Sequence, residues 1–148
     1  MRNLIFKNLI GKWNIYRKLS ENGRANGTVK GVATITIIND ALLIYNETGK
    51  WEDNNSKTIG EISKTYQYKY TKESDEISKY FDEDLPRLFY KLKFDKNNPK
   101  MAKATHLCAK DNYNAIYNFY NENFFELTYV VHGPKKEQVI NTLFTRQV

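Results

Sequence analysis

Hydrophobic and polar residues alternate with a period of two through most of the chain. This alternation is typical of β-strands that bury one face. It predicts ten strands, at Ile10–Ser20, Thr28–Ile38, Ala41–Glu47, Ser63–Thr71, Glu76–Phe81, Arg87–Phe94, Met101–Lys110, Tyr113–Tyr120, Phe124–His132 and Glu137–Arg146. Only Arg2–Ile10 favours a helical or irregular segment, and it could plug or flank one end of the fold.

Short polar turns separate most of these predicted strands, as at Asn22–Gly23, Asn39–Asp40 and Gly133–Pro134. Consecutive tight turns make sequence neighbours antiparallel. Because closing the sheet removes its exposed edges, we expect an all-β fold: one antiparallel up-and-down β-barrel of about ten strands over residues 1–148. The longer polar segment 49–61 is expected to be a loop, either a lid or simply mobile.

The alternation also predicts which side chains face the inside of the barrel. Leu88 and Tyr90 share the inward face of one strand, and His106 and Cys108 share that of another. A buried Glu47 or His106 is costly unless it is partnered or hydrated, so the pattern favours a pocket over a filled core. The ligand-binding residues predicted are Tyr45, Glu47, Tyr68, Tyr90, His106, Tyr113 and Tyr129, with Lys136 near the mouth, where Arg17 could also lie.

The segment from His106 to Tyr113 holds the chain's only cysteine and is a candidate for a metal site or a catalytic pair. His106 and Cys108 point the same way on one strand, but zinc needs three or four ligands, so no metal site is predicted. Cys108 is expected to pack as a small buried residue, and Asp111 to bond the backbone two residues ahead of it in a turn. Gly133 and Pro134 are expected to form a turn. No catalytic residue is assigned.

Composition and charge add little about partners. The net charge is +6, but lysines outnumber arginines and are scattered, which disfavours a nucleic-acid surface although tyrosines near lysines could stack on bases. The chain has no apolar run long enough to span a membrane and no hydrophobic region typical of a signal peptide. A single cysteine is compatible with a reducing compartment, so we expect a cytoplasmic protein.

Two features far apart in the sequence suggest how the barrel is closed. Gly11 and Trp13 form a Gly-x-Trp pattern on the first strand, and Arg146 ends the last strand. The combination resembles the calycin superfamily, which includes the lipocalins and fatty-acid-binding proteins. That resemblance implies that Arg146 packs over the indole of Trp13 as a structural pair.

Motifs along nearly the whole chain, including "GKWNIYRKL", "LLIYNETG", "THLCAKDNYNAIYNF" and "VVHGPKKEQVINTLFTR", resemble the bacterial domain-of-unknown-function family numbered 6314. Its most specific marks match at His106, Cys108, Asp111, Tyr113, Gly133, Pro134 and Lys136. The chain departs from the family pattern at Tyr90, Tyr129 and Gln138, where histidine, tryptophan and tyrosine are common. The missing histidine weakens any scheme with two imidazoles, and the family supplies no reaction.

The sequence therefore favours a barrel that binds a small molecule of unassigned identity. An enzyme that uses Glu, His and Tyr groups in the same pocket remains an alternative. So does a haem protein with His106 as axial ligand, and so does a nucleic-acid binder. The cofactor and the oligomeric state are left open.

Overall fold

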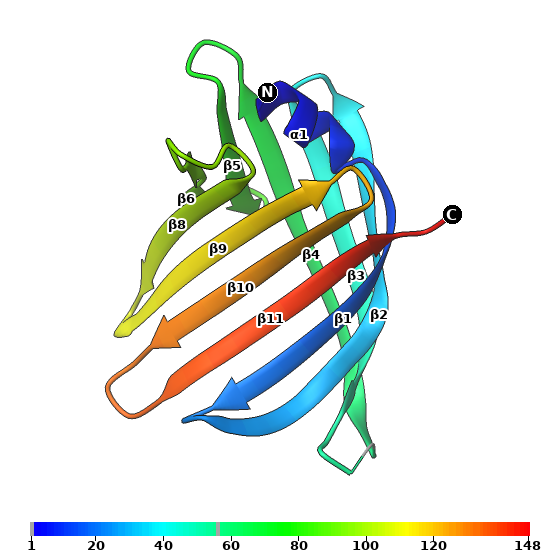
Figure 1. Ribbon diagram of the computed structural model, residues 1–148, viewed down its shortest axis with the longest axis vertical. Helices are drawn as coiled ribbons and strands as arrows, with labels where there is room; N and C mark the ends of the chain where they lie inside the picture. The colour runs from blue at the N-terminus through cyan, green and yellow to red at the C-terminus, as the bar shows by residue number, and fades with distance from the viewer. Residues whose placement is uncertain (1, 56) are drawn as a thin grey trace.

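The computed structural model describes residues 2–55 and 57–148 as one antiparallel β-barrel with a short N-terminal helix (Figure 1). The elements are α1 (Arg2–Asn8), β1 (Gly11–Glu21), β2 (Arg24–Asn39), β3 (Leu42–Glu52), β4 (Thr58–Thr71), β5 (Glu76–Phe81), β6 (Arg87–Lys91), β7 (Lys93–Phe94), β8 (Met101–Cys108), β9 (Asp111–Asn121), β10 (Phe124–His132) and β11 (Glu137–Arg146). The all-β barrel expected from the alternation is confirmed, and the described strands number eleven rather than ten.

The sheet follows the chain order, and β1 pairs with β11 to join its two halves. The segment predicted as one strand, Arg87–Phe94, changes partner at Leu92. Its first part, β6, pairs with β5, whereas the short β7 pairs with β8. The amide of Leu92 still donates to the carbonyl of Ile77 at 2.9 Å. This seam, where β6 lies close to β8, nearly closes the barrel.

One end of the barrel is covered by α1, which lies across the opening in Figure 1. Ile5 and Phe6 of the helix and Leu9 beyond it join the hydrophobic core. The Phe6 ring packs against Tyr70, with ring centroids 5.5 Å apart. Burying three apolar side chains shields much of the core at this end from water. A small cavity of about 120 Å³ remains beside α1, lined in part by Leu4, Leu9 and Trp13.

The segment 49–61 is not a loop, which corrects the sequence prediction. β3 continues to Glu52 and β4 begins at Thr58, with Lys50 opposite Glu61. None of the described residues of this segment is fully buried, and most of its polar side chains are exposed, so the strands here need no strict apolar alternation. Asp53 accepts bonds from the amides of Asn55 and Lys57 in the turn; Ser56 lies outside the described residues.

The predicted parity of β6 is wrong at Leu88, which is 39% exposed, whereas Phe89 is buried. The register between β5 and β6 shifts, so that Tyr80 faces Leu88 but Lys79 faces Tyr90. An extra residue in one strand turns the following side chains to the opposite face. Phe89 and Tyr90 are therefore both buried.

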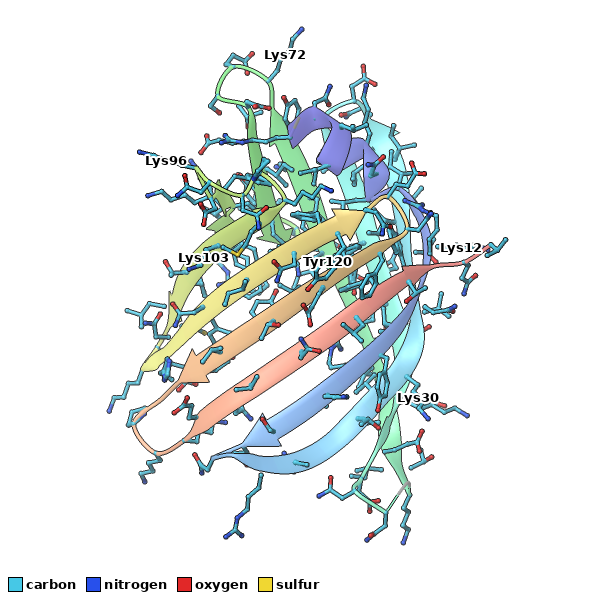
Figure 2. The ribbon with its side chains drawn as sticks, viewed as in Figure 1. Lys12, Lys30, Lys72, Lys96, Lys103 and Tyr120 are labelled. Atoms are coloured by element: carbon cyan, nitrogen blue, oxygen red, sulfur yellow. The ribbon has the colours of Figure 1, made fainter. Side chains whose placement is uncertain are left out.

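The outer surface carries most of the charge. Figure 2 shows Lys12, Lys30, Lys72 and Lys96 projecting from different parts of the barrel rather than gathering on one face. In the described part of the chain, no helix has the length and apolar character needed to cross a membrane.

Candidate functional site

A cavity of about 240 Å³ occupies the barrel toward the end opposite α1. β1, β3, β4, β5, β6, β8, β9, β10 and β11 all contribute side chains to it. It is lined by Arg17, Tyr45, Glu47, Lys64, Tyr66, Lys79, Phe81, Phe89, His106, Cys108, Tyr113, Leu127, Tyr129, Ile140 and Phe144. The wall thus combines aromatic rings with a few charged groups, which is typical of small-molecule sites.

A buried ion pair forms one part of this wall. Arg17 donates from both terminal nitrogens to the two carboxylate oxygens of Glu47, each at 2.7 Å. Arg17 Nε donates to Thr142 at 2.7 Å, and the Tyr45 hydroxyl donates to Glu47 Oε1 at 2.5 Å. Burial acts to raise the pKa of Glu47, but the bonds and charge of Arg17 outweigh it and lower the pKa. The carboxylate is held ionised and has little freedom to act as a base.

Lys79 lies beside this pair and is only 3% exposed. Its Nζ is within 6 Å of six aromatic ring centroids, the closest being Tyr66 at 4.2 Å; the others belong to Tyr45, Tyr68, Phe89, Tyr90 and Tyr129. Ring faces attract an ammonium and replace part of its lost hydration. Burial nevertheless lowers the pKa of Lys79 to about 7, although the Glu47 carboxylate opposes the shift.

Four phenols form a hydrogen-bonded chain beneath the cavity. Tyr68 bonds to Tyr117 at 2.8 Å, Tyr117 to Tyr90 at 2.6 Å, and Tyr90 to Tyr129 at 2.6 Å. Lys79 Nζ donates to the Tyr129 hydroxyl at 3.1 Å. Burial raises the pKa of all four phenols, so each stays protonated near neutral pH.

The structure brings five of the predicted ligand-binding residues to the cavity wall: Tyr45, Glu47, His106, Tyr113 and Tyr129. Tyr68 and Tyr90 are buried behind that wall in the phenol chain. Lys136 is exposed in the turn between β10 and β11, at the end of the barrel where Cys108 and Asp111 lie, and it does not line the cavity. Its side chain lies beyond the last residue pair of the β10–β11 ladder, His132 and Glu137.

Cys108 is exposed rather than buried, which corrects the sequence prediction. Its inward parity is right, since it lines the cavity, but it is the last residue of β8 and stands at the rim. The described residues show no bond from Asp111 to the backbone of Tyr113. Asp111 instead pairs with Cys108 across a two-residue turn, and its side chain lies against Gly133. Gly133 and Pro134 do form a turn, in which the Gly133 amide donates to the Lys136 carbonyl at 2.9 Å.

At the opposite end, the Arg146 guanidinium lies 4.3 Å from the ring centroid of Trp13. Arg146 also donates to the backbone carbonyls of Asn8, Ile10 and Glu122. The guanidinium thereby ties the end of β11 to the segment that follows α1. Phe125 lies between this arrangement and the cavity, because its ring packs on Trp13 and also stacks on Phe144 of the cavity wall.

Lys79 is a charged residue of the cavity wall that the sequence reasoning missed. The signal was present, because Ile77, Lys79 and Phe81 alternate along β5 and must share one face. Arg17 likewise alternates with Trp13 and Ile15 on β1 and so points inward rather than at the rim. No cluster of three or more His, Cys, Asp or Glu side chains suited to a metal ion occurs in residues 2–55 and 57–148.

Comparison with known proteins gives a family match over residues 9–146, to the family of unknown function DUF6314. No protein with a curated function matches the sequence.

Among solved structures, an S-type phycobiliprotein lyase, CPES, from Guillardia theta is similar, with a TM-score of 0.75 at 9% identity over 98% of this chain and 92% of that one. At this identity the similarity concerns the fold alone. A redesigned β-barrel, mFAP0, bound to DFHBI, gives a TM-score of 0.48 at 8% identity over 94% of this chain and 99% of the other.

Proposed function

The chain belongs to DUF6314, a family of unknown function, and we propose that this member binds a small, planar, acidic molecule inside its barrel. The observation that carries the proposal is the cavity itself: an aromatic hollow of about 240 Å³ with two lysines and an ion pair in its wall. Ligand sites are concave, largely apolar and supplied with a few oriented polar groups.

The buried charges support a binding role over a role in stability. An ion pair taken out of water is often no better for stability than apolar residues of the same volume. Arg17 and Glu47 are nevertheless placed in the barrel, with Thr142 and Tyr45 completing their bonds. Polar groups held this firmly are preorganised to receive a ligand.

The charge of the wall supports an acidic ligand. Arg17 and Glu47 neutralise each other, and no other carboxylate lines the cavity. Lys64 at the exposed rim, together with the protonated fraction of Lys79 inside, then leaves an excess of positive charge. A carboxylate or similar group on the ligand would balance that excess.

The shape of the wall supports a planar ligand of modest size. The Phe89 ring lies nearly parallel to that of Tyr129, with centroids 6.0 Å apart, and His106 meets Phe89 edge-on at 5.1 Å. Aromatic walls favour stacking and edge contacts with another ring. Pockets for drug-sized ligands span roughly 300–1,000 Å³, so this cavity fits a smaller molecule. His106 and Tyr113 then contact the ligand from the cavity wall.

The proposal is tested by native mass spectrometry of protein taken directly from cells and by calorimetry with 4-(hydroxymethyl)benzoate. Leu127→Phe fills the cavity, whereas Val130→Phe adds the same ring to the outer face of the same strand. We expect Leu127→Phe to weaken binding about tenfold or more, which is ~1.4 kcal/mol, and Val130→Phe to leave it unchanged. Absence of any bound molecule in the mass spectrum, together with no calorimetric binding, would contradict the proposal.

A further inference from the structure

The amine of Lys79 faces the cavity with most of its bonding capacity unused. An ammonium has three donors, yet among the described residues Nζ donates only to the hydroxyl of Tyr129. The remaining positions around Nζ are ring faces and the open cavity. A bound molecule can therefore reach the nitrogen without displacing a protein partner.

The groups facing Lys79 also decide its protonation. Burial lowers its pKa to about 7; Glu47 on β3 opposes this, and Arg17 on β1 and Lys64 on β4 add to it. The other titratable groups around Nζ are phenols on β3, β4, β6 and β10, which stay protonated. An ordinary lysine has a pKa of about 10.4, so at pH 7 the neutral, nucleophilic fraction of Lys79 is about a thousandfold larger.

We infer that Lys79 forms an imine with the carbonyl carbon of a small aromatic aldehyde held in the cavity. The inference deepens the proposed function, on which it rests: the acidic planar ligand also carries a carbonyl group directed at Nζ. An enclosed lysine beside a cavity is the arrangement that Schiff-base chemistry requires, because the neutral amine is available and water is limited.

The step balances with groups already in place. The amine attacks the carbonyl carbon, a nitrogen–carbon bond forms, and the nitrogen loses two protons. The carbon–oxygen bond breaks, and the oxygen leaves as water with those two protons. Tyr129, bonded to Nζ at 3.1 Å, is placed to donate a proton to the departing oxygen and regain one from the nitrogen. No oxidant or reductant takes part.

The test is reductive trapping of the full-length protein with 4-formylbenzoate and cyanoborohydride, followed by peptide mapping. We expect Lys79 to be modified about tenfold or more faster than any other lysine at pH 7, with a rate that rises through a midpoint near pH 7. Lys64 is the internal comparison, because it lines the same cavity but stands at the exposed rim. Modification spread over surface lysines, with Lys79 no faster than the rest, overturns the inference.

Variants separate chemistry from folding. Lys79→Arg keeps a cation inside the ring cage but cannot form an imine, so trapping at this site should vanish. Lys96→Met, on the outer surface away from the cavity (Figure 2), should leave trapping at Lys79 unchanged, and Tyr129→Phe should slow it while leaving the fold intact. Equal trapping rates in the wild type and Tyr129→Phe contradict the role given to that hydroxyl, and because mapping is done on the wild type, the main result does not depend on any variant folding.

The two proposals fail differently. The alcohol 4-(hydroxymethyl)benzoate matches the aldehyde in size and charge but cannot form an imine. If the alcohol binds in the cavity and the aldehyde is not trapped at Lys79, the imine is wrong and the binding function stands. If the wild type binds neither compound and carries no molecule from cells, the binding function fails as well.

Discussion

The two ends of the barrel each hold an arginine that points inward, and the two arginines are satisfied in opposite ways. Arg146, near α1, stacks on Trp13 and donates to backbone carbonyls, with no carboxylate partner among the residues that the structure describes. Arg17, near the cavity, is buried and bound to both oxygens of Glu47. The Arg146–Trp13 contact closes one end of the barrel, whereas the Arg17–Glu47 pair lines the cavity.

The difference shows what burial demands of a charge. Carbonyl dipoles and a ring face are enough for Arg146, because its guanidinium is only partly buried. Arg17 has no comparable access to water and needs a full counter-charge. Lys79 differs from both arginines, since aromatic rings and one phenol hydroxyl surround it. Its pKa falls to about 7, so only part of the population is charged near neutral pH.

The largest effect is expected from Glu47→Leu, which leaves Arg17 charged and buried without its partner. We expect the free energy of unfolding to fall by about 3–5 kcal/mol in urea denaturation. The double variant Arg17→Met with Glu47→Leu should recover most of that loss, because no lone charge remains. A loss below about 1 kcal/mol in the single variant would mean that water reaches Arg17 freely.

A smaller effect should appear in the pH dependence of stability. Between pH 7 and 9 the unfolded chain keeps the Lys79 proton while the folded protein loses it, so stability rises with pH. Relative to Lys79→Met, the wild type should gain up to about 1.4 kcal/mol per pH unit in urea titrations. Identical pH profiles for the two proteins would show that Lys79 stays charged when folded.

At the closed end, Arg146→Met should cost about 1–2 kcal/mol of unfolding free energy, less than the loss of Glu47. The carbonyls of Asn8, Ile10 and Glu122 would then rely on water, which reaches this partly exposed region. Ligand affinity measured by calorimetry should not change. A loss of affinity as large as that of a cavity variant would break the separation of the two ends.

The smallest effect is expected for Cys108→Ser at the cavity rim. Cys108 is exposed, so stability should change by no more than about 0.5 kcal/mol. In the native wild type the thiol should react with a disulfide reagent as fast as it does in urea. Strong protection in the native state would place the side chain inside the cavity.

The sequence predicted the barrel because alternation and tight turns act locally, and β10 and β11 begin and end where the pattern placed them. It failed where the outcome depends on pairing between strands. The shift that buries Phe89 arises from the register of β5 against β6, which no single-strand pattern reveals. The hairpin over residues 49–61 was missed because its described residues include no fully buried side chain, so it lacks strict alternation.

The site was predicted in outline, since Tyr45, Glu47, His106, Tyr113 and Tyr129 do meet at one cavity. Lys79 was missed because a lysine on an inward face contradicts its usual preference for water, although its alternation with Ile77 and Phe81 was plain. Cys108 shows the reverse error: a residue type that is usually buried lies at a strand end, where the barrel stops.

The change of partner at Leu92 makes the seam between β6 and β8 the most weakly paired part of the barrel. β7 pairs with β8 at two positions and β6 with β5 at four, whereas β8 pairs with β9 at eight. Local opening is easiest where few backbone hydrogen bonds must break, so amide hydrogen exchange should be fastest along this seam. Phe89 and Tyr90 lie on it and also enclose Lys79. The part of the sheet that should open most easily therefore also forms part of the wall around Lys79.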